Sequence, residues 1–265
     1  MIIKSFIDFL KDGGLMLAGS LSYFTIMAFV PFCLFLITLF GSFLGHYQQF
    51  YQFFLNKLIS FFPEITSEVT KELEKLITFR GIGTFSIVLY GILSYQVFAS
   101  LENALNVIFK IKKRRSFLWS IILSSIIVTI IINIILLSFL ATSLIPLLKT
   151  LKPFFPALKI GKITSFLIRY VVPFFMIFFI VTVLYILIPR KKVKISHALF
   201  GALFTTTFLE VAKHLFTWYV GTVVRFGTIY GSLTAFVVFL LWMFYSSCIF
   251  LIGAEVVHNQ GNYRR

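Results

Sequence analysis

The sequence predicts an all-α protein: an integral membrane bundle of six transmembrane helices, with an amphipathic helical segment between the first and the second. Of its 265 residues, 59% are hydrophobic and only 12% charged, whereas a soluble domain carries about a quarter charged residues. The apolar residues form blocks longer than the roughly 20 residues that a helix needs to cross a bilayer. Two of the connections between neighbouring blocks are short and strongly basic.

Six apolar blocks follow one another along the chain, and each is long enough to span the hydrocarbon core as a helix. Several exceed the required length, so we expect tilted helices or extensions beyond the bilayer. The sequence shows no internal repeat or second domain, so residues 1–265 are predicted to form a single polytopic transmembrane domain. The predicted spans cover about residues 15–44, 82–109, 117–148, 163–188, 195–220 and 233–256.

Residues 46–80 form the longest piece between predicted spans. The first half is rich in aromatic residues and ends at Pro63. In the second half, apolar residues recur at helical spacing from Ile65 to Ile77, opposite charged residues. This pattern is typical of an amphipathic helix that lies at the outer membrane interface or packs against the bundle.

The basic connections predict the orientation of the bundle. One, from Lys110 to Arg115, joins the second and third predicted spans, and the other, from Arg190 to Lys194, joins the fourth and fifth. Short loops rich in Lys and Arg stay on the cytoplasmic side. Six spans place both connections on that side and make both termini cytoplasmic. The connection between the third and fourth spans also carries four Lys, although this topology places it outside.

Ionisable side chains at membrane depth are costly, so they are candidates for a functional site. Glu102 and Asn106 lie in the second predicted span, in its cytoplasmic half. Glu210, Lys213 and His214 lie in the outer half of the fifth. These five residues are our candidates for the lining of a substrate cavity.

These candidates also have a structural interpretation. Glu210 and Lys213 are three residues apart, so they share a helix face and can neutralise each other. Asn106 can serve as an interhelical hydrogen-bond partner. Glu102 has no cation within one helical turn, which makes it the strongest functional candidate. Glu255 ends the sixth predicted span, where we expect it to be solvated at the interface.

The sequence offers no catalytic or metal-binding pattern. The four His are scattered, and no HExxH spacing, GxSxG elbow or Walker-type phosphate loop is present. Two Cys lie inside apolar spans, which argues against a disulfide framework or a zinc site. We therefore expect no enzymatic activity, no cofactor and no metal. The net charge of +15 is concentrated between spans, where membrane topology explains it better than nucleic-acid binding.

A family pattern runs through most of the predicted spans. In the first span, the matches to A-x-x-L-x-Y-x(7)-P are Ala18, Leu21, Tyr23 and Pro31, with Ala28 where Ser is common. The middle of the chain contributes Leu105-Asn106, Arg115-Ser116-Phe117, Ile188-Pro189, Glu210, Lys213, Phe216 and Tyr219. The most specific group is Tyr230-Gly231-Ser232-Leu233, Trp242, Tyr245 and Gly253-Ala254-Glu255. In these residues the chain resembles the YihY/BrkB-like family of bacterial inner-membrane proteins.

This resemblance implies a six-helix bundle in the bacterial cytoplasmic (inner) membrane, with both ends cytoplasmic. Members of the family are associated with virulence, serum resistance or envelope lipid handling. Some have been labelled ribonuclease BN, a name generally regarded as a misassignment. The present sequence gives that label no support, because it lacks the clustered acids and His that a metal-dependent nuclease needs.

We therefore expect a multi-pass membrane protein that handles or transports a lipid or another amphipathic envelope molecule without catalysis. The expected partners are membrane lipids and a second copy of the chain, but not nucleic acid. Two alternatives stay open. The first is a structural or scaffold protein of the envelope, whose polar groups lock helix packing, and the more remote one is an intramembrane enzyme.

Overall fold

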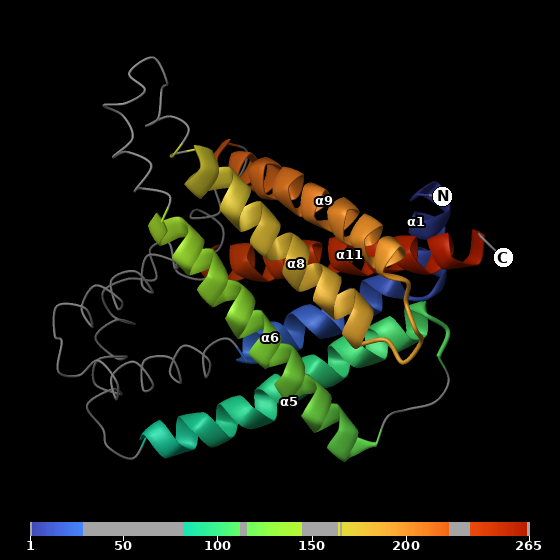
Figure 1. The fold of residues 1–265 in the computed structure, drawn as a ribbon, viewed down its shortest axis with the longest axis horizontal. Coiled ribbons are helices and arrows are strands. Elements are labelled where there is room, and N and C mark those ends of the chain that lie inside the picture. Colours follow the sequence, from blue (N-terminus) through green and yellow to red (C-terminus); the bar gives the residue numbers. More distant parts are fainter. Residues whose placement is uncertain are drawn as a thin grey trace, which may run out of the picture. The chain divides into compact units, whose positions relative to one another are not determined.

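The structure, a computed structural model, describes residues 2–28, 82–111, 116–144, 164, 166–222 and 234–263 (Figure 1). These residues are helical, with short turns and no strand, which confirms the all-α class for this part of the chain. Its helices are α1 (Ile2–Lys11), α5 (Ile82–Ile108), α6 (Phe117–Leu144), η2 (Leu167–Val171), α8 (Val172–Leu187), α9 (Ile195–Thr222) and α11 (Thr234–Tyr263). A further apolar helix, Gly14–Ala28, follows α1.

Three helices are long and apolar enough to cross a membrane. They contain Leu118–Ser138 of α6, Ile195–Tyr219 of α9 and Val237–Gly261 of α11, and they coincide with the third, fifth and sixth predicted spans. The shorter apolar helices Gly14–Ala28 and Val172–Leu187 fall in the first and fourth. The count of six spans stays a prediction. So does the amphipathic segment, because residues 46–80 lie outside the described residues.

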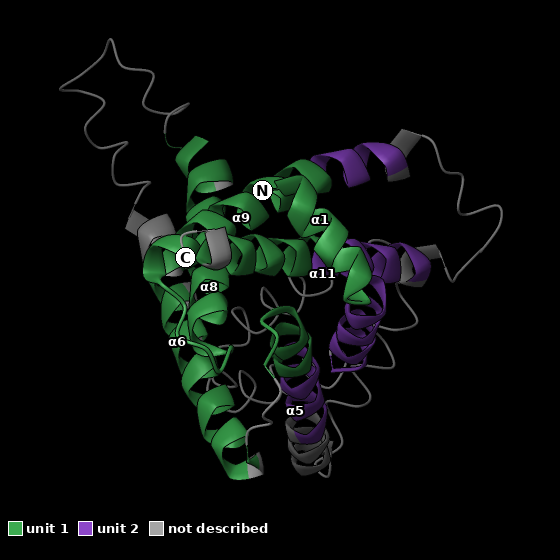
Figure 2. Cartoon of the chain, turned by 90° about the vertical axis from the view of Figure 1, so that its right-hand side faces the viewer, with its two compact units in different colours: residues 1–14, 102–213, 249–265 green, residues 15–101, 214–248 purple. Residues whose placement is uncertain are grey.

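The chain forms two compact units, which Figure 2 distinguishes by colour. The first comprises residues 1–14, 102–213 and 249–265, and the second comprises residues 15–101 and 214–248. Three helices, α5, α9 and α11, contribute residues to both. Each polar contact described below lies within one unit.

Close packing of α8, α9 and α11 in the first unit depends on Gly253. A Cβ at this position of α11 would lie 1.8 Å from Thr205 Oγ1 on α9 and 2.5 Å from the Tyr185 hydroxyl on α8. The Tyr185 hydroxyl donates to the carbonyl oxygen of Phe250 at 2.6 Å and lies 2.8 Å from Thr205 Oγ1. The Tyr185 hydroxyl has a single proton, which it donates to the Phe250 carbonyl, so in the second hydrogen bond the Thr205 hydroxyl must be the donor. Three helices therefore meet around one buried hydroxyl.

Two glycines form the turn after α1. Gly13 has a φ of +70°, a left-handed conformation that Gly adopts without steric cost. A Cβ on Gly14 would lie 2.2 Å from the ring of Phe9, which is buried. These two residues let α1 end at Lys11 and the next helix begin at once.

A π-helical turn, η2, precedes α8. The Val172 N–H donates to the carbonyl oxygen of Leu167, which is the wide hydrogen bond of a π-helix. Pro173 follows directly and has no N–H to donate. Proline removes one backbone hydrogen bond of a helix. Here this loss lies next to the point where the π-helix η2 changes to the α-helix α8.

Candidate functional site

The buried carboxylate of Glu102 on α5 is held by α6. The Ser120 hydroxyl donates to Glu102 Oε2 at 2.7 Å, so the contact joins two helices. One turn along α5, Asn106 is half-buried, and its Oδ1 has no hydrogen-bond partner among the residues that the structure describes. A polar contact between two apolar helices also stabilises their packing.

Glu210 and Lys213 form an ion pair on one face of α9, which confirms that their three-residue spacing brings them together. Lys213 Nζ lies 2.5 Å from Glu210 Oε1, and the two side chains are 47% and 26% exposed. His214 is also exposed. Several large apolar or aromatic side chains near them on α9 are exposed, namely Phe208, Val211, Leu215, Trp218 and Tyr219, and Thr207 and Thr217 are exposed as well. We call Glu210, Lys213 and His214 the polar patch of α9.

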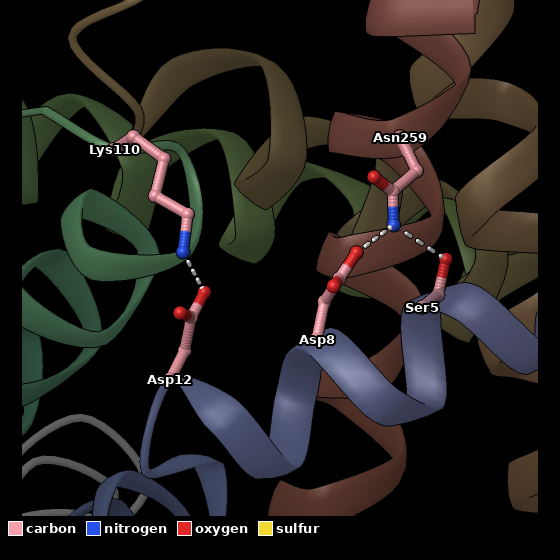
Figure 3. A network of polar contacts seen from close by, with 5 residues as sticks. All are labelled: Ser5, Asp8, Asp12, Lys110 and Asn259. Atoms are coloured by element: carbon pink, nitrogen blue, oxygen red, sulfur yellow. Dashed lines mark hydrogen bonds and ion pairs between the residues drawn. The ribbon is translucent and has the colours of Figure 1, made fainter.

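A second polar cluster, absent from our sequence predictions, joins the first and last helices (Figure 3). From α11, Asn259 Nδ2 donates to Asp8 Oδ2 at 2.9 Å and to Ser5 Oγ at 3.1 Å, both on α1. Asp12, one turn beyond Asp8, forms an ion pair with Lys110, just past the end of α5. With Glu255, these residues make up what we call the terminal cluster: Ser5, Asp8, Asp12, Lys110, Glu255 and Asn259.

Glu255 is fully buried, so the prediction that it is solvated at the interface is wrong. The residue is 0% exposed, and α11 continues past it to Tyr263 instead of ending near this position. Neither oxygen of its carboxylate has a hydrogen-bond partner among the described residues. The charged groups that act on it are Asp12, Lys110 and Asp8.

Lys110 reaches Asp12 from an unusual backbone conformation. Its φ is +56°, in a region that usually belongs to Gly and that costs other residues about 1–2 kcal/mol. The Ile111 N–H donates to the Asn106 carbonyl at 2.8 Å and the Lys110 N–H to the Val107 carbonyl at 3.0 Å, which is the Schellman pattern that ends a helix. A Gly here would relieve the backbone, but it would supply no cation for Asp12.

Sequence signals for the terminal cluster exist but are weak. Ser5, Asp8 and Asp12 recur at the spacing of one helix face, and Asn259 follows Glu255 by one helical turn. Each pattern predicts a polar face on its own helix. Neither indicates that the first helix and the last helix meet.

The family-pattern residues that the structure describes have different surroundings. Gly253 occupies the tight contact with Thr205, and the Trp242 ring packs 5.2 Å from the Phe216 ring between α11 and α9. Tyr23, in contrast, is exposed. Among the motif positions, Pro31, Arg115 and Tyr230-Gly231-Ser232-Leu233 lie outside the described residues.

Comparison with known proteins covers almost the whole chain. The family model described as Virulence factor BrkB matches residues 5–264. A UPF0761 membrane protein of Haemophilus influenzae is 28% identical over 244 residues, which is 90% of this chain and 87% of the relative. Similar proteins of the same name occur in Aliivibrio fischeri (29% identical over 258 residues, 93% and 78%) and Aggregatibacter aphrophilus (27% over 250 residues, 90% and 84%).

No solved structure matches this chain. The family match extends over the terminal cluster, the polar patch of α9 and the three long apolar helices. The relatives are membrane proteins by name, in agreement with those helices. The chain is a membrane protein that belongs to the BrkB family.

Proposed function

We propose that this protein handles an amphipathic envelope molecule, such as a phospholipid, along its membrane-spanning helices and without catalysis. The polar patch of α9 carries the proposal, because its charges lie exposed among apolar side chains in a helix long enough to cross a membrane. Charged groups at membrane depth are costly unless a polar group meets them. A lipid headgroup is a polar group that arrives already joined to apolar chains.

The chemistry of the patch suits a headgroup that carries both charges. The Lys213 ammonium can donate to phosphate oxygens, and the Glu210 carboxylate can accept from a headgroup amine. Acyl chains would lie against the exposed apolar residues of the same helix. When no headgroup is bound, Lys213 and Glu210 neutralise each other at 2.5 Å, which limits the free-energy cost of exposing their charges.

The proposed setting is the bacterial cytoplasmic membrane, with both termini in the cytoplasm. Support comes from His258 near the end of α11, which interacts electrostatically with Lys110 and Lys191, one from each basic connection. The contact between Asp8 and Asn259 brings α1 to the same end of α11. Lys110, Lys191 and α1 thus lie near the same end of α11, in keeping with the tendency of basic loops to stay cytoplasmic.

Movement of labelled phospholipid across liposomes that contain the protein tests this function. Glu210→Gln combined with Lys213→Gln removes both charges, and we expect it to slow movement about tenfold or more, which corresponds to about 1.4 kcal/mol in the barrier. The matched control is Lys192→Gln, an exposed Lys in the connection before α9, which should keep the wild-type rate. Wild-type movement no faster than in protein-free liposomes would refute the proposal.

A structural role is the second candidate, and specific contacts favour it. Ser120 with Glu102, and Thr205 with Tyr185, are side-chain hydrogen bonds between different helices. Such bonds stabilise helix packing in membranes. Under this function Glu102→Gln lowers thermal stability in detergent, while loss of the charges on α9 changes no cellular phenotype.

A further inference from the structure

We propose that the terminal cluster is a proton-binding site, in which Glu255 and Asp12 share one proton between their carboxyl groups. The proposal goes beyond the handling of amphipathic molecules and does not depend on it. It rests on the burial of Glu255, on the acid that faces it and on the balance of charge around the two groups.

Glu255 is enclosed without the hydrogen bonds that an ionised carboxylate needs. The residue is 0% exposed, and neither Oε1 nor Oε2 has a partner in the described part of the chain. Glu102 offers a comparison within the same unit, because it is also buried but accepts a hydrogen bond from Ser120 at 2.7 Å. A carboxylate that loses its water and gains no donor is strongly disfavoured, whereas a protonated carboxyl group is not.

The group that faces Glu255 is another acid. The side chains of Asp12 and Glu255 interact, and the charge of Asp12 repels an ionised Glu255. Two ionised carboxylates cannot bond to each other, since each can only accept. A single proton between them lets one oxygen donate to the other and removes their repulsion. Lys110 pairs with Asp12, whereas neither oxygen of Glu255 has a hydrogen-bond partner among the described residues.

The charged groups around Glu255 favour the binding of one proton. Among the groups that act on Glu255, two are acids and Lys110 is the cation. Asp8 is held by the neutral amide of Asn259. The titratable groups that face the cluster are Asp8 on α1, Asp12 just after α1, Lys110 after α5, Lys191 before α9, and Glu255 and His258 on α11.

A proton fits the site better than a metal ion. Within the described ranges, the acids are not placed as a group of three or more metal ligands. Asn259 presents its amide nitrogen to the cluster, and an amide nitrogen that donates hydrogen bonds is not a ligand for a cation. The ammonium of Lys110 already lies against Asp12. A shared proton needs only one oxygen from each acid.

Infrared spectroscopy of the full chain in detergent at neutral pH tests the proposal directly. We expect the carbonyl stretch of a protonated carboxylic acid, with a shift to lower frequency in heavy water. Glu255→Gln should remove this band. Glu210→Gln is the matched control, because it alters a half-buried Glu of the polar patch of α9 that is not part of the terminal cluster, and it should leave the band unchanged.

Thermal stability gives an independent measurement. The folded chain would hold a proton that the unfolded chain releases at neutral pH, so stability falls as the pH rises. Glu255→Gln keeps the shape of the protonated acid and should flatten this slope. If that variant does not fold, Asp12→Asn replaces the partner carboxylate by an amide, and the infrared band should shift or disappear.

Two results would overturn the proposal. The first is a spectrum without any carboxylic-acid band that depends on Glu255. The second is stabilisation by sodium, potassium, magnesium or calcium ions that Glu255→Gln abolishes while no such band is present, because an ion then neutralises the pair. Neither result bears on phospholipid movement, which the substitutions at Glu210 and Lys213 test separately.

Discussion

Gly253 shows how the choice of one residue fixes the distance between helices. Gly253 belongs to the family pattern in the sequence, but the pattern by itself assigns no role to this residue. In the structure, its missing side chain makes room for the Thr205 and Tyr185 hydroxyls, at 1.8 Å and 2.5 Å from where a Cβ would stand. Neither distance leaves space for a carbon atom, so any larger residue must push α8 or α9 away.

Gly253→Ala should therefore destabilise the protein by about 1–3 kcal/mol, the usual cost of overpacking. The melting temperature in detergent measures the effect. Gly19→Ala is the matched control, because a Cβ on Gly19 would meet no atom within 4 Å and Ala favours a helix over Gly by about 1 kcal/mol. Equal melting temperatures for wild type and Gly253→Ala would contradict the close contact.

Residue environments differ in how far the sequence predicts them. The pairing of Glu210 with Lys213 could be predicted, since residues three apart on any helix lie side by side. The surroundings of Glu255 could not be predicted in this way. They depend on the length of α11 and on the acids that α1 brings to it, and both are consequences of tertiary structure.

At the scale of the element, α1 reverses the usual arrangement of an amphipathic helix. Its polar Ser5 is buried and Asp8 is bonded by Asn259. Its exposed side chains include the apolar Ile2, Ile3, Phe6, Ile7 and Leu10. In a membrane protein such an apolar stripe suits the lipid interface. The bonds to Asn259 thus decide which face of α1 turns toward the rest of its unit.

Asn259→Ala should loosen α1, because it removes the donor to both Ser5 and Asp8. Each lost bond weakens the attachment by about 1 kcal/mol or more, so amide hydrogen exchange within Ile2–Lys11 should quicken about tenfold or more. Asn133→Ala serves as the control, since the Asn133 amide donates to the Thr129 carbonyl on its own helix. Unchanged exchange in the Asn259 variant would show that Asn259 does not hold α1.

Across the whole molecule, the sequence predicts the bounds of most long helices to within a few residues, but not the end of the last one. The predicted spans began at 117, 195 and 233, and the structure begins α6 at Phe117, α9 at Ile195 and α11 at Thr234. The predicted end of the last span was too early. Hydropathy falls near Glu255, but the helix continues to Tyr263, and Asp8 and Ser5 accept hydrogen bonds from the Asn259 side chain one turn after Glu255. Apolar faces look alike in sequence, so helix partners could not be inferred.

The predicted topology places both termini and both basic connections in the cytoplasm. Lys4→Cys and Lys192→Cys, each introduced after Cys33 and Cys248 are replaced by Ala, should react with a membrane-impermeant thiol reagent only when the cytoplasmic face is open to it. Lys159→Cys, in the connection predicted to lie outside, should react in intact spheroplasts and acts as the control. Labelling of Lys4→Cys in intact spheroplasts would contradict this topology.

The terminal cluster also affects the order in which the chain can fold. Asn259 and Asp8 are 251 positions apart, so during synthesis α1 emerges long before its partner on α11. Closing so long a loop costs entropy and comes late. Until Asn259 has been synthesised, Asp8 cannot accept its hydrogen bond, and α1 is not attached to α11 through this contact. A chain that stops before Asn259 therefore cannot attach α1 in this way.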